Sequence, residues 1–181
     1  MKSLRKGLSS RLPVAGIAGA LLISAGIGFA FAAGGDNTDT TPTCNQGWVW
    51  DEKKGQCVQQ QSGVLPDGAL SDYAYALTQE GRYREALDVL ALMKVPNTPE
   101  ALNYKGYATR KLGRIDEGIG YYLESVKLDA DYTLVREYLG EAYIQLGRVD
   151  LARDQLAEIE KRCGMSCEPY VELDAAINAA L

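Results

Sequence analysis

The chain has 181 residues, a length typical of one domain with room for a small additional module. It contains no histidine and carries a formal net charge of −5. Without histidine, the commonest general base and the commonest transition-metal ligand are missing. The acidic balance argues against a nucleic-acid partner, because phosphate binding requires a basic surface. We therefore expect no cofactor, no metal site and no catalytic residues.

Residues 1–33 have the three parts of a secretory signal peptide. The start is free of acids and holds four basic side chains, Lys2, Arg5, Lys6 and Arg11. An apolar stretch over 12–33 follows and ends in Ala30-Phe31-Ala32, whose small alanines are typical of a signal-peptidase cleavage site. Cleavage leaves 15 basic and 24 acidic side chains, a net charge of −9, in a periplasmic or secreted protein. The alternative is an uncleaved inner-membrane anchor facing the periplasm, because about 20 apolar residues can span a bilayer.

Four cysteines follow the leader: Cys44, Cys57, Cys163 and Cys167. In an oxidising compartment, an even number of thiols usually forms disulfides. Three pairings are possible, and proximity in sequence favours Cys44 with Cys57 and Cys163 with Cys167. A four-cysteine zinc site and a redox pair are the alternatives, but neither close pair has the two-residue spacing that those sites use.

Residues 34–43 have the composition of a flexible linker, and 44–58 are predicted to form a small cysteine-bounded hairpin. Trp48 and Trp50 are two residues apart, so on a strand their side chains point the same way. They are predicted to cover the disulfide and dock on the first helix, because so small a unit needs both for a core. The alternative is that they stack on a sugar ring, since the hairpin faintly resembles the core of small chitin-binding modules. Residues 59–66 form a second linker.

Three glycines, Gly81, Gly113 and Gly147, lie 32 and 34 residues apart, each between two helix-like stretches. A period of this size is typical of stacked helical repeats. Asp67 is predicted to cap the first helix, which runs to about Glu80. The second helix carries apolar residues from Tyr83 to Met93. Thr98-Pro99 then starts the second pair with a helix cap followed by proline.

Residues 67–162 resemble tetratricopeptide repeats of an exported bacterial type. The resemblance rests on a small residue seven before each glycine, a small residue five after it, and a large residue nine after it. These are Ala74, Gly106 and Gly140; Ala86, Gly118 and Ala152; and Leu90, Tyr122 and Leu156. Four residues before the glycine the family usually has a tyrosine. Tyr143 matches it, whereas Leu77 and Thr109 do not, and Ala130 occupies a position where the family usually has proline. The resemblance implies an all-α fold, a short right-handed superhelix of three helix pairs.

Residues 163–181 are predicted to form a tight disulfide turn and a capping helix that begins at Glu168-Pro169. Tyr170, Leu173, Ile177 and Leu181 share one face of that helix. This face is predicted to cover the apolar edge of the third pair, because a repeat buries its face only against a neighbour.

The resemblance further implies that the first helix of each pair lines a concave, protein-binding groove. By spacing from the glycines, the inward-facing candidates are Ser71, Tyr75, Thr78, Asn103, Tyr107, Arg110, Glu137, Glu141 and Ile144. The expected partner is a peptide or another protein, and the membrane is involved only through an uncleaved leader. The alternative function is a cell-envelope glycan binder acting through Trp48 and Trp50. No serine elbow or phosphate-binding loop supports an enzyme. The oligomeric state is left open.

Overall fold

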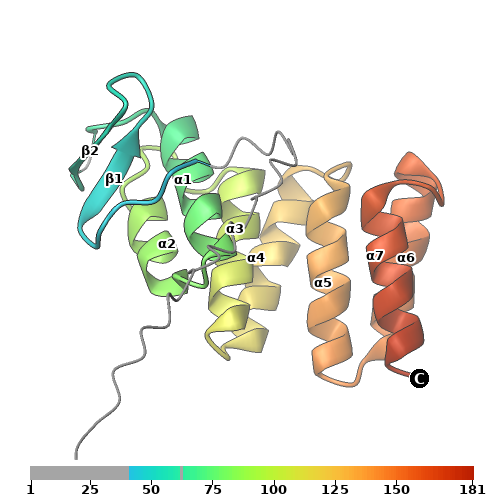
Figure 1. Cartoon of the computed structure of the whole chain (residues 1–181). Coiled ribbons are helices and arrows are strands. Elements are labelled where there is room, and N and C mark those ends of the chain that lie inside the picture. The colour runs from blue at the N-terminus through green and yellow to red at the C-terminus, as the bar shows by residue number, and fades with distance from the viewer. Residues whose placement is uncertain (1–40, 62) are drawn as a thin grey trace, which may run out of the picture. The chain divides into compact units, whose positions relative to one another are not determined.

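The computed structural model describes residues 41–61 and 63–181. Within these ranges the chain forms a two-stranded antiparallel sheet followed by seven helices (Figure 1). The predicted signal peptide and nearly all of the first linker lie outside the described residues. No helix in the described ranges is long and apolar enough to cross a membrane.

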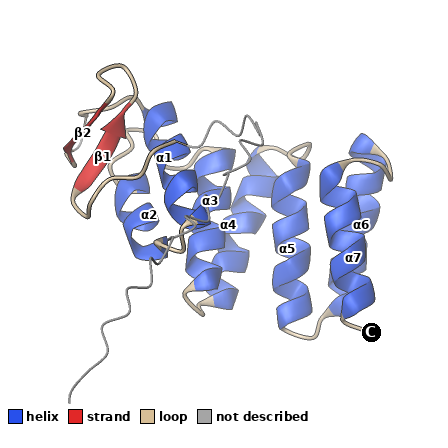
Figure 2. Ribbon diagram, viewed as in Figure 1, coloured by secondary structure: helices blue, strands red, loops and turns tan. Residues whose placement is uncertain are grey.

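The elements follow the predicted order. The strands are β1 (Trp48–Asp51) and β2 (Gln56–Gln59). The helices are α1 (Asp67–Gln79), α2 (Tyr83–Leu90), α3 (Pro99–Lys111), α4 (Ile115–Leu128), α5 (Thr133–Gln145), α6 (Val149–Cys163) and α7 (Glu168–Ala179). Figure 2 shows the hairpin as the only sheet among the described residues, next to a row of helices. A mostly helical protein with one small hairpin is confirmed.

The helices pack in sequential pairs: α1 with α2, α3 with α4, and α5 with α6. The first helix of each pair also packs on the first helix of the next, so α1 contacts α3, α3 contacts α5, and α5 contacts α7. We call α1, α3, α5 and α7 the first-helix layer. Two apolar cores lie between the helices, one shared by the hairpin with α1–α3 and one by α4–α7.

The three turn glycines adopt the same backbone geometry. Gly81, Gly113 and Gly147 have φ of 74°, 85° and 71°, a region that residues with a Cβ rarely occupy. The N–H of the residue after each glycine donates a hydrogen bond to a carbonyl of the preceding helix, as Arg82 does to the Leu77 carbonyl at 2.9 Å. The glycine N–H bonds one residue later in that helix, which together forms a Schellman cap. The sequence period therefore records one repeated turn.

The small residues are the places where helices touch. A Cβ added at Gly118 of α4 would lie 2.8 Å from the Gly106 carbonyl oxygen of α3. A Cβ at Gly106 would lie 2.5 Å from the Tyr122 ring, and one at Gly140 would lie 2.6 Å from Leu173. At such separations a methyl group forces backbone or buried side chains apart. The close packing predicted at Gly106, Gly118 and Gly140 is confirmed.

Two predicted helix boundaries are wrong. Asp67 is not the cap but the first residue of α1, and its carboxylate accepts the N–H groups of Lys94 at 2.9 Å and Val95 at 2.8 Å. These bonds lower the pKa of Asp67 and fasten the segment after α2 to the start of α1. Helix α2 ends at Leu90 and does not include Met93. The Met93 side chain is still buried, but it comes from the connection after the helix. Thr98 caps α3 as predicted, accepting the Ala101 N–H at 3.1 Å.

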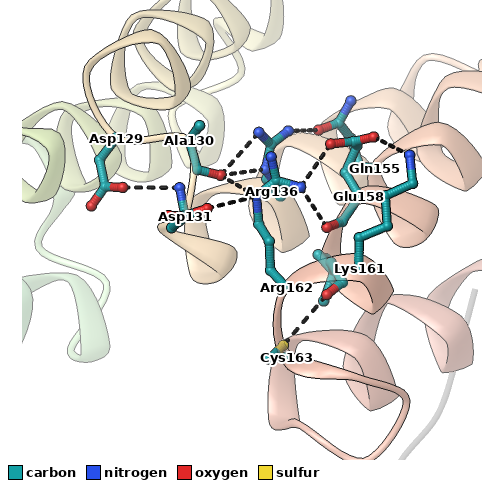
Figure 3. A network of polar contacts seen from close by, with 10 residues as sticks. Asp129, Ala130, Asp131, Arg136, Gln155, Glu158, Lys161, Arg162 and Cys163 are labelled. Carbon is teal, nitrogen blue, oxygen red and sulfur yellow. Dashed lines mark hydrogen bonds and ion pairs between the residues drawn. The ribbon is translucent and has the colours of Figure 1, made fainter.

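Ala130 lies at the centre of a polar network in the turn between α4 and α5 (Figure 3). Its carbonyl accepts two N–H groups from Arg136, at 3.2 and 3.1 Å, and one from Arg162. Arg162 also pairs with Asp131 at 3.3 Å and Glu158 at 2.7 Å, tying the turn to α6. Hydrogen bonds from Lys161 and Arg162 lower the pKa of Glu158 to about 2. Residue 130 takes part through its backbone carbonyl, so these bonds do not depend on the alanine side chain.

Both predicted disulfides are present. The Cys163–Cys167 bond joins the end of α6 to the residue before α7. Leu173 and Ile177 of α7 are buried against α5 and α6, so this helix caps the array as predicted. Leu181 is wrongly included in the buried face, because α7 ends at Ala179 and this side chain is 79% exposed.

The Cys44–Cys57 bond closes the hairpin, which packs on α1 through β1. Val49 is fully buried and Cys44 nearly so, whereas Trp48 is 47% exposed and Trp50 is half-buried against the core. The expectation that both tryptophans form the core of this unit is wrong. The alternation of a strand directs Val49 toward the helices and leaves Trp48 on the other face. Two disulfides are typical of a non-cytoplasmic protein.

Candidate binding surface on the first-helix layer

The predicted groove residues separate by burial into two groups. Ser71, Thr78, Asn103, Arg110 and Glu137 are buried, whereas Tyr75, Tyr107, Glu141 and Ile144 keep some exposed surface. The buried positions lie ten or three residues before a turn glycine, and the exposed tyrosines lie six before it. Position ten before the glycine therefore faces neighbouring helices and position six faces solvent. Position three is buried at Thr78 and Arg110 but only half-buried at Ile144.

The buried polar residues bind other parts of the protein. Asn103 donates from Nδ2 to the Tyr132 hydroxyl at 3.2 Å and so joins α3 to the turn before α5. The Thr78 hydroxyl donates to the Tyr75 carbonyl at 2.7 Å. Within the described residues, Ser71 Oγ and Asn103 Oδ1 are buried without a hydrogen-bond partner. In this conformation Asn103 and Thr78 are positioned to support the surface and not to contact a partner.

Tyrosines at equivalent positions of successive helices form a continuous surface. Tyr75 and Tyr107 lie six residues before their turn glycines, and Tyr104 and Tyr138 lie nine before theirs. Positions three apart share a helix face. The Tyr75 and Tyr104 ring centroids are 5.3 Å apart, and those of Tyr107 and Tyr138 are 5.1 Å apart. We call these four residues the tyrosine face. Each close pair joins one helix of the first-helix layer to the next.

Tyr104 and Tyr138 are functional candidates that sequence reasoning missed. The signal was their common spacing nine residues before the turn glycine, a position occupied by Asp72 in the first pair. Burial raises the pKa of both tyrosines. Their hydroxyls therefore stay protonated near neutral pH and remain available as hydrogen-bond donors.

Arg110 supports the tyrosine face from beneath. Its side chain is almost completely buried and donates from Nη2 to Glu141 Oε2 at 2.6 Å and from Nε to the Tyr122 hydroxyl at 3.3 Å. The guanidinium carbon lies 5.5 Å from the centroid of the Tyr107 ring, within cation–π distance. Lys111 approaches the same ring, with Nζ 5.2 Å from its centroid. Arg110 is thus a positioning residue that fixes Tyr107 and Glu141.

An acidic region adjoins the tyrosine face on α5 and α7. Glu137 is only 6% exposed. Burial, with a smaller contribution from the negative charges of Glu141, Glu172 and Glu168, raises the pKa of its carboxyl to about 8, and Arg110 lowers it only in part. A positively charged group is the natural complement of this region.

A second acidic region lies where the hairpin meets α1. Trp50, Tyr75, Glu52 and Asp72 line a recess of about 420 Å³, together with Thr41, Pro42 and Ala69. This volume falls within the range of sites for small ligands or single side chains. Tyr75 belongs to both the recess and the tyrosine face, so the two form one continuous surface.

The chain matches no protein-family model, and a search of curated proteins finds no significant relative. Among residues 41–61 and 63–181 there is also no group of three or more cysteine, aspartate or glutamate side chains placed to hold a metal ion.

Proposed function

We propose that this chain is an exported protein–protein interaction scaffold of the tetratricopeptide-repeat type. The repeated glycine turns and the contacts of Gly106, Gly118 and Gly140 support the assignment to this repeat type. A right-handed superhelix, which the family implies, would present the first-helix layer on its concave side. The proposal is of a binding protein and not of an enzyme.

The observation that carries the proposal is the tyrosine face. Four tyrosines line neighbouring helices, and Tyr75 is 42% exposed even though its ring contacts Tyr104. Tyrosine is enriched at binding hot spots because it offers a large rigid contact area together with a hydroxyl. The partner that fits is an extended peptide or a helix of another protein, lying across α1, α3 and α5.

The proposed location is the periplasm or the exterior, reached through the signal peptide of residues 1–33. The disulfides support an oxidising compartment. Retention of the leader would instead anchor the scaffold in the inner membrane. Mass spectrometry of the mature amino terminus distinguishes the two.

Site-specific photocrosslinking tests the surface. A benzophenone amino acid replaces Tyr107 in one variant and the exposed Leu123 of α4 in a control, and crosslinked partners are identified by mass spectrometry. We expect a defined partner to crosslink at 107 and not at 123. The variant Tyr75→Ala/Tyr107→Ala should lose capture of this partner while its helical content stays unchanged. Capture of the same partner by both variants with equal yield contradicts the proposal.

A second candidate function is the binding of cell-envelope glycans. The exposure of Trp48 and the position of Trp50 in the recess favour it, because sugar rings stack on exposed aromatic side chains. Sedimentation with purified peptidoglycan or chitin tests it. Retention that is lost in Trp48→Ala/Trp50→Ala and kept in Tyr107→Ala would favour this function over the scaffold.

A further inference from the structure

We propose that the recess between the hairpin and α1 binds the positively charged side chain of a lysine or arginine, supplied by the partner segment on the tyrosine face. This inference rests on the proposed scaffold function and goes beyond it, because it assigns a site and a chemical class to one contact. The site consists of Trp50, Tyr75, Glu52 and Asp72.

The lining has the chemistry of a cation site. Trp50 and Tyr75 supply aromatic rings, whose electron-rich faces attract ammonium and guanidinium groups. Glu52 and Asp72 supply negative charge, and no basic residue is among the described residues of the lining. Neither carboxylate forms an ion pair with any residue of 41–61 or 63–181, whereas the neighbouring Asp51 pairs with Lys54 at 3.0 Å. Two carboxylates are thus available to an incoming cation.

The recess is preorganised on its hairpin side. Trp50 pairs with Cys57 across the strands, and the disulfide fixes Cys57 to Cys44. The Cys44 backbone is in turn held by α1 and the turn after it: its N–H donates to the Tyr73 hydroxyl at 2.8 Å, and its carbonyl accepts from Arg82 at 2.6 Å. A wall that is fixed before binding loses little conformational freedom when the ligand enters.

The helical side is equally regular. Ala69, Asp72 and Tyr75 are three residues apart along α1 and therefore lie on one face. Ala69 leaves space at the start of this row, and Asp72 lies between the small residue and the aromatic ring. Asp72 occupies the same position, nine residues before the turn glycine, that Tyr104 and Tyr138 occupy in the next two pairs. The first pair therefore has a carboxylate where the others have an aromatic ring.

Charge complementarity extends beyond the recess. The tyrosine face begins at Tyr75 in the recess and reaches Tyr138 on α5, near a region whose negative charges come from Glu141, Glu168 and Glu172. Acidic side chains thus adjoin both ends of a tyrosine surface. A partner segment with basic residues toward both of its ends fits this pattern, whereas an acidic segment would be repelled.

Fluorescence anisotropy with labelled 12-residue peptides tests the inference. The peptides alternate glycine and serine with arginine, lysine, citrulline or glutamate, and citrulline keeps the size of arginine without its charge. The test variant is Glu52→Gln/Asp72→Asn, which keeps the side-chain shapes, and Glu124→Gln on the exposed side of α4 is the matched charge control. Circular dichroism and the thermal midpoint confirm that both are folded.

We expect the arginine and lysine peptides to bind and the citrulline peptide to bind about 3- to 30-fold more weakly, the range expected for cation–π and partly desolvated charge contacts. Glu52→Gln/Asp72→Asn should reduce the binding of the arginine peptide by a similar factor, with little effect on the citrulline peptide. Trp50→Leu should give a comparable loss, and Glu124→Gln should leave all affinities unchanged.

Two results would overturn the inference, and they differ in what they say of the scaffold. In the first, the peptides bind, and Tyr107→Ala lowers their affinity, but Glu52→Gln/Asp72→Asn binds every peptide as tightly as the native chain does. The recess is then not a cation site, and the scaffold function stands. If no peptide of any composition binds, and glycan retention depends on Trp50 but not on Asp72, both the inference and the scaffold function fail in favour of the glycan binder.

Discussion

The two ends of the helical array are closed in different ways. At the first end, the hairpin has little core of its own and is held to α1 and the following turn by the buried Val49 together with polar bonds to Tyr73 and Arg82. At the last end, α7 is held by apolar packing, with Leu173 inserted against Gly140 of α5. Each end also carries a disulfide.

On the proposed function, this difference distinguishes a hairpin that takes part in binding from a helix that only caps the array. The hairpin contributes Trp50 and Glu52 to the recess, which shares Tyr75 with the tyrosine face, so the proposed ligand would depend on the position of the hairpin. The α7 helix covers the apolar edge of the last pair. We therefore expect changes at the α7 end to affect the stability of the whole array, and changes at the hairpin to affect mainly the hairpin and the recess.

The largest effect should come from Leu173→Ala. Removing a fully buried leucine side chain costs about 2–5 kcal/mol, the lost transfer energy plus the energy of the cavity. Urea unfolding followed by circular dichroism measures it. Val171→Ala in the same helix is the control, because Val171 is exposed and should change the free energy of unfolding by less than about 0.5 kcal/mol. Equal effects of the two substitutions would contradict the role of α7 as an apolar cap.

The two disulfides should differ in the region that their removal releases. A loop of 13 residues is closed by Cys44–Cys57, and such a bond stabilises its unit by about 3 kcal/mol in the chain-entropy model. Since an isolated two-stranded hairpin is marginal in water, Cys44→Ser/Cys57→Ser should expose 48–59 to hydrogen exchange and allow trypsin to cut at Lys53 and Lys54. The helices should remain protected.

The matching variant at the other end is Cys163→Ser/Cys167→Ser. Packing of Leu173 and Ile177 should keep α7 docked, so its amides stay protected from exchange while only 163–167 become mobile. Loss of protection throughout α7 would show that the disulfide, and not the apolar packing, holds this end.

The third effect concerns Glu137 and the dependence of stability on pH. Burial raises its pKa in the folded state to about 8, above the ordinary value of 4.5. Between these values the folded state holds a proton that the unfolded state has lost, so the free energy of unfolding falls as the pH rises from about 4.5 to 8. Glu137→Gln should remove this fall, gaining about 1–3 kcal/mol relative to the native chain between pH 5 and pH 8.

Urea unfolding at several pH values measures this difference, with Glu124→Gln on the exposed side of α4 as the control. A native chain whose stability does not change between pH 5 and pH 8 would contradict the assigned burial and charge environment of Glu137.

The smallest effect should come from Tyr73→Phe. The Tyr73 hydroxyl accepts the N–H of the buried Cys44 and donates to the Trp48 carbonyl at 3.3 Å. Removing the hydroxyl leaves the Cys44 N–H unpaired, at a cost of about 1–2 kcal/mol. Tryptophan fluorescence, which reports on the hairpin, should show an earlier urea midpoint while circular dichroism changes less. Tyr75→Phe, on the exposed side of the same helix, should change neither midpoint.

Features fixed by local chemistry could be predicted from the sequence. A glycine at positive φ lies between the two helices of each pair, and glycines occupy positions where helices touch. The cysteines that are close in sequence form the two disulfides. These requirements act within a few residues or repeat with a fixed period. Thr98 followed by Pro99 marked a helix start for the same reason.

Features that depend on neighbouring helices could not be predicted in the same way. Periodicity places a residue on a face but does not say which neighbour covers that face. Asn103 and Arg110 were therefore expected in a groove and are buried, while Tyr104 and Tyr138 were missed. The bond from Asp67 to the segment at Lys94 spans 27 residues, and no local rule indicates it.

Nuclear magnetic resonance shift mapping tests the central claim most directly. The isotope-labelled chain is titrated with the tightest-binding arginine peptide, and backbone amide and tyrosine ring shifts are followed. We expect the perturbed signals to gather on α1, α3 and α5, with the rings of Tyr75, Tyr104, Tyr107 and Tyr138 among the most affected. Perturbations confined to α2, α4 and α6, or to Trp48 alone, would contradict a protein-binding surface on the first-helix layer.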